Sequence, residues 1–162
     1  YNTDPLYLIA RIGIVFDTSI IPAEAILASG FIQYYAVTKY LNTSIQIQKG
    51  TSAHPADFIL TSDYDKSYAS GNCGAKNVID FILNDYNNIT LTDLTCITKA
   101  GTTRVYIREA TYDIAGTEPT VEGAVYGISG NGSEADNPPK LSVTYDIPQF
   151  IIRSLNKKQM VI

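Results

Sequence analysis

Two extended segments joined by a polar corner constrain the fold of this chain more than any other feature. Residues 7–16 are apolar at nearly every position apart from Arg11 and Gly13, which is typical of a central strand with both faces covered. Residues 17–22 combine short polar side chains with a proline and favour a tight turn. Residues 26–39 form a second long segment with the alternation of a strand. This part of the sequence therefore predicts a strand, a corner and a second strand.

Further strands are indicated by alternation of apolar and polar residues along the rest of the chain. Thr92 is a suitable N-cap for one short helix, which Gly101 would end. No helix-sized segment separates the strands in the way that parallel sheets require. The pattern predicts an all-β fold, an antiparallel β-sandwich of eight or nine strands with at most one short helix. The additional predicted strands cover residues 44–49, 58–60, 78–83, 88–91, 103–109, 121–128 and 140–145.

The length of 162 residues suits one domain, and we see no internal repeat or interior linker. We expect the sandwich to cover residues 1–146 and a C-terminal tail to cover residues 147–162. A frayed terminus is normally polar, but this tail is apolar and locally basic. It could pack on its own subunit or add to an exposed sheet edge of a neighbouring one. Its large apolar residues are Phe150, Ile151, Ile152, Leu155, Met160, Val161 and Ile162.

The charge and composition exclude some partners. The formal net charge is −4, and nucleic acid is not expected because phosphate binding requires clustered Lys and Arg. No apolar run approaches the ~20 residues that cross a bilayer, so membrane insertion is not expected either. The many Thr, Ser and Asn residues favour an extracellular, cell-surface or virion location. The first residue is Tyr1 in place of Met, which indicates a processed protein or a fragment.

Cys73 and Cys96 are the only cysteines in the chain. Their spacing matches no zinc pattern, which needs four ligands from Cys or His. The two residues could form a disulfide that connects two loops, a pairing that an extracellular location favours. They could equally be two separate buried thiols, since free Cys is among the most buried residue types.

A series of short motifs runs through the chain in a fixed order. They are Arg11, residues 16–19 (Phe-Asp-Thr-Ser), Pro22, Ile26, the strand from Phe31, and residues 56–58, 101–108 and 137–145. Together they resemble the DNRLRE-type modules, which are related to the disaggregatase modules and to a family of carbohydrate-binding modules. The resemblance implies a jelly-roll β-sandwich, as found in secreted, cell-surface and phage structural proteins. Some members of that family bind polysaccharide.

Candidate sugar-binding residues are aromatic and polar side chains that alternation places on outward strand faces. Aromatic rings can stack on the apolar side of a sugar, and polar groups can bind its hydroxyls. Tyrosine also covers sheet faces without binding anything, because only its hydroxyl needs water. The candidates are Tyr34, Tyr106, Arg108 and Tyr126.

Catalysis is not predicted. His54 is the only histidine, and a Ser-His-Asp system would need Ser52 or Ser62 and a carboxylate such as Asp57 beside it. The Gly-x-Ser-x-Gly pattern of the strained turn that carries such a serine is absent from the sequence. The acidic residues are scattered, and no two of them stand out as the carboxylate pair that glycoside hydrolysis requires. No cofactor is expected.

Residues 63–67 and the pair Arg11 and Asp17 are polar, and each has a structural interpretation beside a ligand-binding one. Residues 63–67 place oxygen side chains at alternate positions, but the rest of a calcium loop is missing, so structural calcium is possible without a full motif. Asp17 is expected to accept amide hydrogen bonds at the corner, and Arg11 to cap carbonyls or pair with a carboxylate. Participation of both in a ligand site is the alternative.

The sequence as a whole favours a non-catalytic structural module that associates with copies of itself, or with other surface or virion proteins, through sheet edges and its tail. The alternative is a carbohydrate-binding module of a larger secreted or tail-fibre protein, with polysaccharide as its partner. The first predicts a defined oligomer, and the second a monomer with weak affinity for saccharides.

Overall fold

The computed structural model describes residues 10–40, 43–57, 60–117, 127–130 and 136–148. These residues are predominantly β structure, which confirms the all-β prediction. The strands are β1 (Ile12–Asp17), β2 (Ile26–Lys39), β3 (Ser44–Gly50), β4 (Ala69–Asn77), β5 (Asp85–Thr90), β6 (Thr102–Glu109), β7 (Ile128–Gly130) and β8 (Lys140–Asp146).

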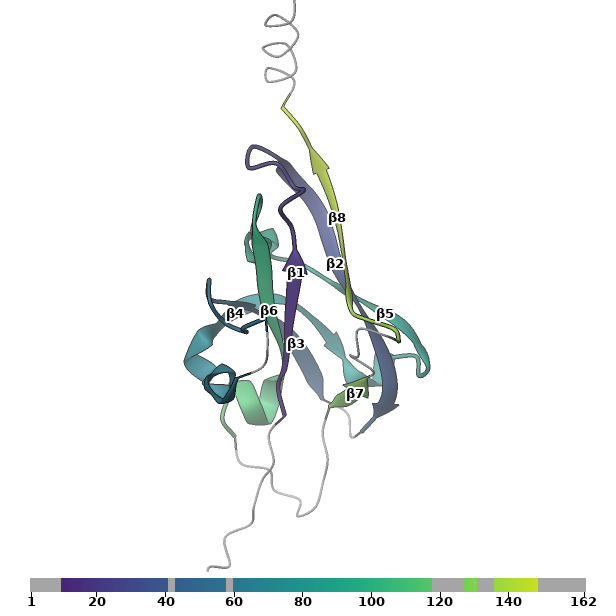
Figure 1. Ribbon diagram of the computed structural model, residues 1–162. Coiled ribbons are helices and arrows are strands. Elements are labelled where there is room, and N and C mark those ends of the chain that lie inside the picture. Colours follow the sequence, from purple (N-terminus) through teal and green to yellow (C-terminus); the bar gives the residue numbers. More distant parts are fainter. Residues whose placement is uncertain (1–9, 41–42, 58–59, 118–126, 131–135, 149–162) are drawn as a thin grey trace, which may run out of the picture.

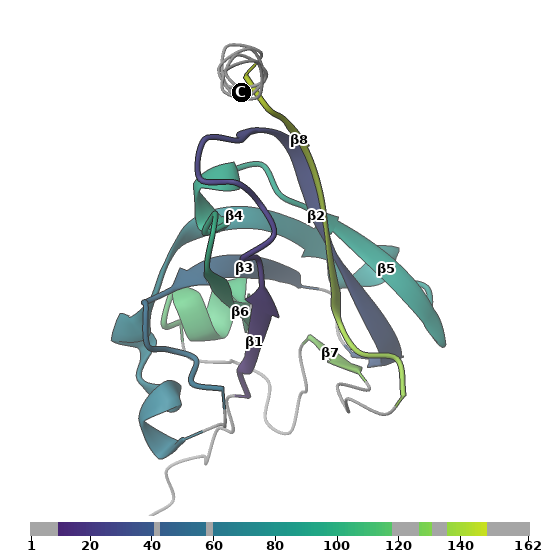
Figure 2. The same cartoon turned by 45° about the horizontal axis from the view of Figure 1, so that its top comes forward.

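The strands form two antiparallel sheets. The first has the order β1-β6-β3-β4. In the second, the 14-residue strand β2 pairs with β5 on one side and with β7 and β8 on the other. Strand β8 pairs with the first half of β2, from Ile26 to Gln33, and β7 pairs with its last residues. Figures 1 and 2 show β8 alongside β2.

The hydrophobic core lies between the two sheets. Alternate residues of β2 are buried, including Ile32 and Ala36, and they belong to one cluster with Ile47 of β3 and Val105 of β6. A strand directs alternate side chains to opposite faces, so each sheet contributes one face to this cluster. The arrangement is that of a β-sandwich.

One lateral side of the sandwich is tightly closed. On this side β4 lies against β5, and a Cβ atom added at Gly74 would stand 2.1 Å from the carbonyl oxygen of Thr90. Only glycine allows so close an approach of two backbones. The inward residues Asn87 and Ile89 of β5 are buried accordingly.

The opposite side, between the edge strands β1 and β8, is less well covered. Of the side chains that these two strands pack against the core, only Ile14 of β1 is buried, and the others are partly buried. The partly buried ones are Ile12 and Phe16 of β1 and Leu141, Val143 and Tyr145 of β8. We call this the open side of the sandwich.

The corner between β1 and β2 is held by polar side chains, as the sequence predicts. Asp17 accepts a hydrogen bond from the amide of Ser19 at 2.9 Å. The buried hydroxyl of Thr18 donates to the carbonyl of Thr98 at 2.6 Å, and the Thr18 amide bonds to the carbonyl of Gly101. These bonds connect the corner to the segment that precedes β6.

Three local predictions are wrong. β1 is an edge strand and not a central one; its outer face is covered by Pro55, which packs where Gly13 has no side chain. Residues 78–83 are not a strand, because they begin with the 3-10 turn η3 (Val78–Asp80). Strand β4 lies between the predicted strands 58–60 and 78–83, where the sequence predicts no strand.

The helical residues form isolated turns. Four are 3-10 turns: η1 (Thr61–Tyr64), η2 (Lys66–Tyr68), η3 and η4 (Leu94–Cys96). The fifth, η5 (Ala110–Ile114), is a π turn. The helix expected after Thr92 is the single turn η4, whose cap is Asp93. The predicted strand 58–60 falls mainly, and 121–128 almost entirely, outside the described residues.

Candidate functional site

The outer face of the first sheet carries a row of buried polar side chains. On β6 the residues Arg104, Tyr106 and Arg108 alternate with the core residues and point away from the sandwich interior. The sequence predicts this orientation, but not the burial of Tyr106 and Arg108. They are buried because the chain after β3 and the turn η5 after β6 contribute residues that cover this face. Figure 2 shows η5 beside β6 and β3.

The centre of this face is a cluster around Asp113, presented by η5. Arg108 binds both carboxylate oxygens of Asp113, with Nε and Nη2 each at 2.8 Å. Arg11, which directly precedes β1, binds the same carboxylate through Nε at 2.9 Å and Nη2 at 2.5 Å. Gln48 of β3 accepts a further bond from Arg108 at 2.8 Å. This Asp113 cluster (Arg11, Gln48, Arg108 and Asp113) ties β1, β3, β6 and η5 together, and it confirms the predicted pairing of Arg11 with a carboxylate.

Local structure holds Asp113 in place. Glu109, the last residue of β6, caps η5 by accepting bonds from the amides of Thr111 at 2.8 Å and Tyr112 at 2.5 Å. Burial alone would raise the pKa of Asp113, but the hydrogen bonds and positive charges of Arg108 and Arg11 outweigh burial and lower it. Asp113 is therefore a carboxylate at neutral pH.

A second pair, His54 and Asp63, lies in the covering segment. The Nδ1 atom of His54 is 2.5 Å from Oδ1 of Asp63. The same carboxylate accepts bonds from the amides of Ala56 at 3.1 Å and Leu60 at 2.7 Å. Burial opposes the ionisation of Asp63, but these bonds and His54 lower its pKa. The ring of Tyr68 stacks on His54 at 4.0 Å.

In this pair the carboxylate of Asp63 orients the imidazole of His54, but no nucleophile is hydrogen-bonded to that imidazole among the described side chains. A carboxylate on Nδ1 directs Nε2 outward, as in an acyl-transfer base. The expected carboxylate, Asp57, is not the one used, because Asp57 binds Arg104 at 2.8 Å instead. Within the described side chains no serine is hydrogen-bonded to His54. The hydrogen bonds of Asp63 instead connect it to His54, Ala56 and Leu60 within the covering segment.

Tyr106 lies on β6 between Arg104 and Arg108. Its hydroxyl is buried and makes no hydrogen bond to the described residues. Burial, with the nearby charge of Asp63, raises the pKa of Tyr106 to about 12. The group is therefore a neutral phenol inside the covered face.

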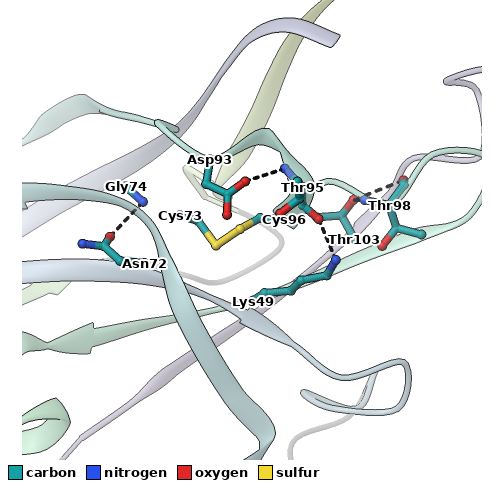
Figure 3. The surroundings of a disulfide bond; sticks show 9 residues. All are labelled: Lys49, Asn72, Cys73, Gly74, Asp93, Thr95, Cys96, Thr98 and Thr103. Carbon is teal, nitrogen blue, oxygen red and sulfur yellow. Dashed lines mark hydrogen bonds between the residues drawn. A yellow bond between two sulfur atoms is a disulfide. The ribbon is translucent and has the colours of Figure 1, made fainter. Parts of the chain in front are cut away.

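A shallow cavity of about 410 Å³ lies at the end of the β3–β6 pair. Two cations line it, Lys49 and Arg104, together with four hydroxyl residues, Thr51, Ser52, Thr98 and Thr102, and Gly50. The ammonium of Lys49 donates to the carbonyl of Thr95 at 2.6 Å, as Figure 3 shows. Apart from Gly50 the lining residues are polar or charged, so the cavity lacks the apolar side chains that line most small-molecule sites.

The outer face of the second sheet presents aromatic and amide groups that are partly or fully exposed. Tyr35 of β2 and Tyr86 of β5 are register partners whose rings meet edge to face at 5.4 Å. Gln33 donates to Asn88 beside them at 3.1 Å. The Lys140 ammonium stands 4.0 Å from the centre of the Tyr86 ring. We call these five residues the tyrosine face.

Three of the predicted sugar-binding residues are not available to a ligand. Tyr34 is buried in the core, and its burial raises its pKa to about 12. Tyr106 and Arg108 are buried under the covering segments. The prediction placed Tyr34 on the outward face of β2, where the structure places Tyr35. Tyr126 and the tail residues 150–162 lie outside the described residues.

The remaining predictions concern the cysteines and calcium. Cys73 of β4 and Cys96 of η4 form a disulfide with a Cα–Cα distance of 6.1 Å (Figure 3). Asp65 caps η2 by accepting from the amide of Ser67 at 2.8 Å, and Asp63 binds His54. No group of three or more metal-ligating residues is found in the part of the chain that the structure describes.

Comparisons with protein-family models, curated proteins and solved structures found no match. Across the described ranges, no helix has the length and apolar character needed to span a membrane.

Proposed function

We propose that this chain is a non-catalytic structural module of an extracellular, cell-surface or virion assembly and that it associates with copies of itself. The exposure of large apolar side chains carries the proposal. Ile20 is 81% exposed, Ile82 64% and Ile79 61%, although the two sheets enclose a core. Apolar side chains that gather on a surface are typical of protein–protein contacts.

Apart from Leu60, the large exposed apolar residues of the described chain gather near the two ends of β2. One group, which we call the end patch, consists of Ile20, Ile26 and Ile147, where β1 ends, β2 begins and β8 ends. The opposite group comprises Val37, Tyr40, Ile79, Ile82 and Leu83. It is held together because Lys39 donates to the carbonyls of Ile79 and Phe81.

The polar clusters support a structural role over a catalytic one. The oxygens of Asp113 and Asp63 are engaged with arginines, backbone amides and His54. Such bonds fix covering segments on a sheet. The disulfide supports an extracellular or virion location, because disulfides persist in oxidising surroundings. The proposal includes a jelly-roll connection of the two sheets, as in the DNRLRE-type modules that the sequence resembles; antiparallel pairing throughout both sheets supports it.

Light scattering of the purified full chain, combined with electron microscopy of the same sample, tests this function. We expect a defined mass that is a multiple of the 17.7 kDa of one chain. A mass of one chain at every concentration tested would overturn self-association.

Carbohydrate binding is the second candidate, and the tyrosine face is the observation that favours it. Its rings and amides have the chemistry that sugar recognition requires. Affinity electrophoresis in gels containing soluble polysaccharides should then show retardation that Tyr86→Ala abolishes. Lys66→Ala, which changes an exposed residue far from this face in the sequence, is the control. Unchanged mobility of the unsubstituted chain in every gel would remove this candidate.

A further inference from the structure

The end patch combines exposed apolar groups with negative charge. Ile20 and Ile26 are 81% and 60% exposed. The exposed carboxylates Asp17, Glu24 and Asp146 belong to the same end, because Asp17 ends β1, Glu24 precedes β2, and Asp146 is the register partner of Ile26. Lys99 is a cation at this end, with its ammonium on the carbonyl of Ala25. A segment that is both apolar and basic would complement this surface.

The C-terminal tail has that composition. Residues 149–162 contain seven large apolar residues and three basic ones, Arg153, Lys157 and Lys158, and no acidic residue. The other 148 residues therefore carry nine basic and all sixteen acidic residues, a formal charge of −7. Opposite charges on two surfaces favour their encounter and orientation. The tail follows β8 directly, so it starts beside the end patch.

The open side continues from the end patch along the molecule. Leu141, Val143 and Tyr145 of β8 and Ile12 and Phe16 of β1 are only partly buried there. Strand β8 pairs with β2 on one side and is an edge of its sheet on the other. Edge strands leave backbone groups unpaired and accept added chain segments. Apolar side chains of the tail could therefore complete the core coverage that this side lacks.

The direction of the chain favours a tail from another molecule. In Figure 1 the described chain continues beyond the end of β8 in the direction of the strand, away from the sandwich. Pro148 restricts Ile147 to extended backbone. Docking on the same subunit would require a reversal of the chain directly after Pro148, whereas docking on a second copy requires none.

We infer that two copies of this chain face each other through their end patches and exchange their C-terminal tails, each tail covering the end patch and open side of the other copy. The arrangement is isologous, with two-fold symmetry. This inference rests on the proposed self-association and names its surface and its partner.

Two full-length variants test the exchange. With Asp17, Asp146 and Lys99 unchanged, Ile20→Lys/Glu24→Lys/Ile26→Lys changes the charge of this end from −2 to +2. Arg153→Glu/Lys157→Glu/Lys158→Glu changes the charge of the tail from +3 to −3. Each variant alone should have the mass of one chain, because patch and tail then carry like charge. Mixing the two should restore a complex of two chains, because each tail again meets a patch of opposite charge.

Leu60→Lys/Thr61→Lys is the control, since it adds two lysines at exposed residues that belong to neither of the two apolar groups. The control variant should keep the mass of the unsubstituted chain. When it is mixed with the acidic-tail variant, no complex that contains one copy of each should form. A monomeric unsubstituted chain would overturn the proposed function. An oligomeric unsubstituted chain whose mass survives Ile20→Lys/Glu24→Lys/Ile26→Lys, or a mixture of the variants that stays monomeric, would overturn only the tail exchange.

Discussion

Replacing Asp113 with Asn should lower the free energy of unfolding by about 3–5 kcal/mol, the range found when one partner of a buried ion pair is removed. The side chain of Asp113 is 1% exposed, and those of Arg108 and Arg11 are also buried. The substitution keeps the shape of the side chain but removes the negative charge. Two guanidinium groups then remain close together with little access to water.

The effect is large because the cluster joins separate parts of the chain. Arg11 and Asp113 are 102 positions apart, and Arg108 and Gln48 are 60 apart. Loss of the carboxylate therefore weakens the contact of η5 with β1 and β6 together. Most domains have a net stability of only about 5–15 kcal/mol, so this loss is a large fraction of the total and is readily measured.

Urea denaturation followed by circular dichroism measures this loss, and Asp57→Asn is the matched control. Asp57 also binds an arginine, with Arg104 at 2.8 Å, but its side chain is 71% exposed. Exposed ion pairs contribute about 0–1 kcal/mol. If the two substitutions lowered stability equally, the buried Asp113 cluster would contribute no more to stability than an exposed ion pair does.

The stability that the carboxylate of Asp113 contributes should depend on pH. The pKa of Asp113 is lowered in the folded protein, so the unfolded state binds a proton first as the pH falls. The stabilisation is complete above about pH 4, the range of an unperturbed Asp, and is lost as the pH falls through the folded pKa. Stability of Asp113→Asn should therefore decline less steeply in acid than that of the unsubstituted chain.

Alternation of apolar residues predicted the strands that pair most regularly. The strands at residues 26–39, 44–49, 103–109 and 140–145 correspond closely to β2, β3, β6 and β8. In each of them apolar residues lie at alternate positions on the core face, such as Ile45 and Ile47 of β3 and Val105 and Ile107 of β6. On β8 the partly buried Leu141, Val143 and Tyr145 alternate with exposed residues.

Strand β4 could not be predicted in this way, because its sequence resembles a loop. Residues 69–77 contain two glycines and two asparagines. What makes them a strand is pairing with β3 and the close approach of Gly74 to β5. Residues 78–83 show the reverse error: they are apolar, but Val78 and Phe81, the two buried ones, are three positions apart and match a 3-10 turn.

The site was harder to predict than the fold. On β2 both Tyr34 and Tyr35 are aromatic, so alternation alone does not decide which one points outward. On β6 the pattern gave the correct outward direction for Arg108 but not its burial, since the covering segments are irregular. Arg11 was expected to pair with some carboxylate, but nothing local to the sequence indicates Asp113 as that partner.

Removing the disulfide should lower the free energy of unfolding by about 3 kcal/mol, from the entropy of closing a loop of this size. Cys73 and Cys96 are 23 positions apart. The closed loop includes η3, β5 and η4, so the unfolded chain loses much of its freedom when the bond is present. Full reduction and the Cys73→Ala/Cys96→Ala variant should both show the loss.

The disulfide also secures one end of the core. The amides of Thr92 and Asp93 bond to the carbonyl of Cys73. Lys49 donates to the carbonyl of Thr95 (Figure 3). Within the same segment, Leu91 and Ile97 are buried in the core, and the Leu91 amide bonds to the carbonyl of Gly30 on β2. Without the disulfide these polar bonds remain, so the folded structure should persist while its stability falls.

Urea denaturation with and without dithiothreitol distinguishes the disulfide from other effects of reductant. The unsubstituted chain should unfold at a lower urea concentration when it is reduced. The Cys73→Ala/Cys96→Ala variant has no disulfide to reduce, so its urea midpoint should be the same with and without dithiothreitol. Equal midpoints for the oxidised and reduced unsubstituted chain would mean that the bond restricts the unfolded chain too little to matter. The hydrogen bonds around Cys73 would then be what holds this end of the sandwich, and a reducing environment would leave the module intact.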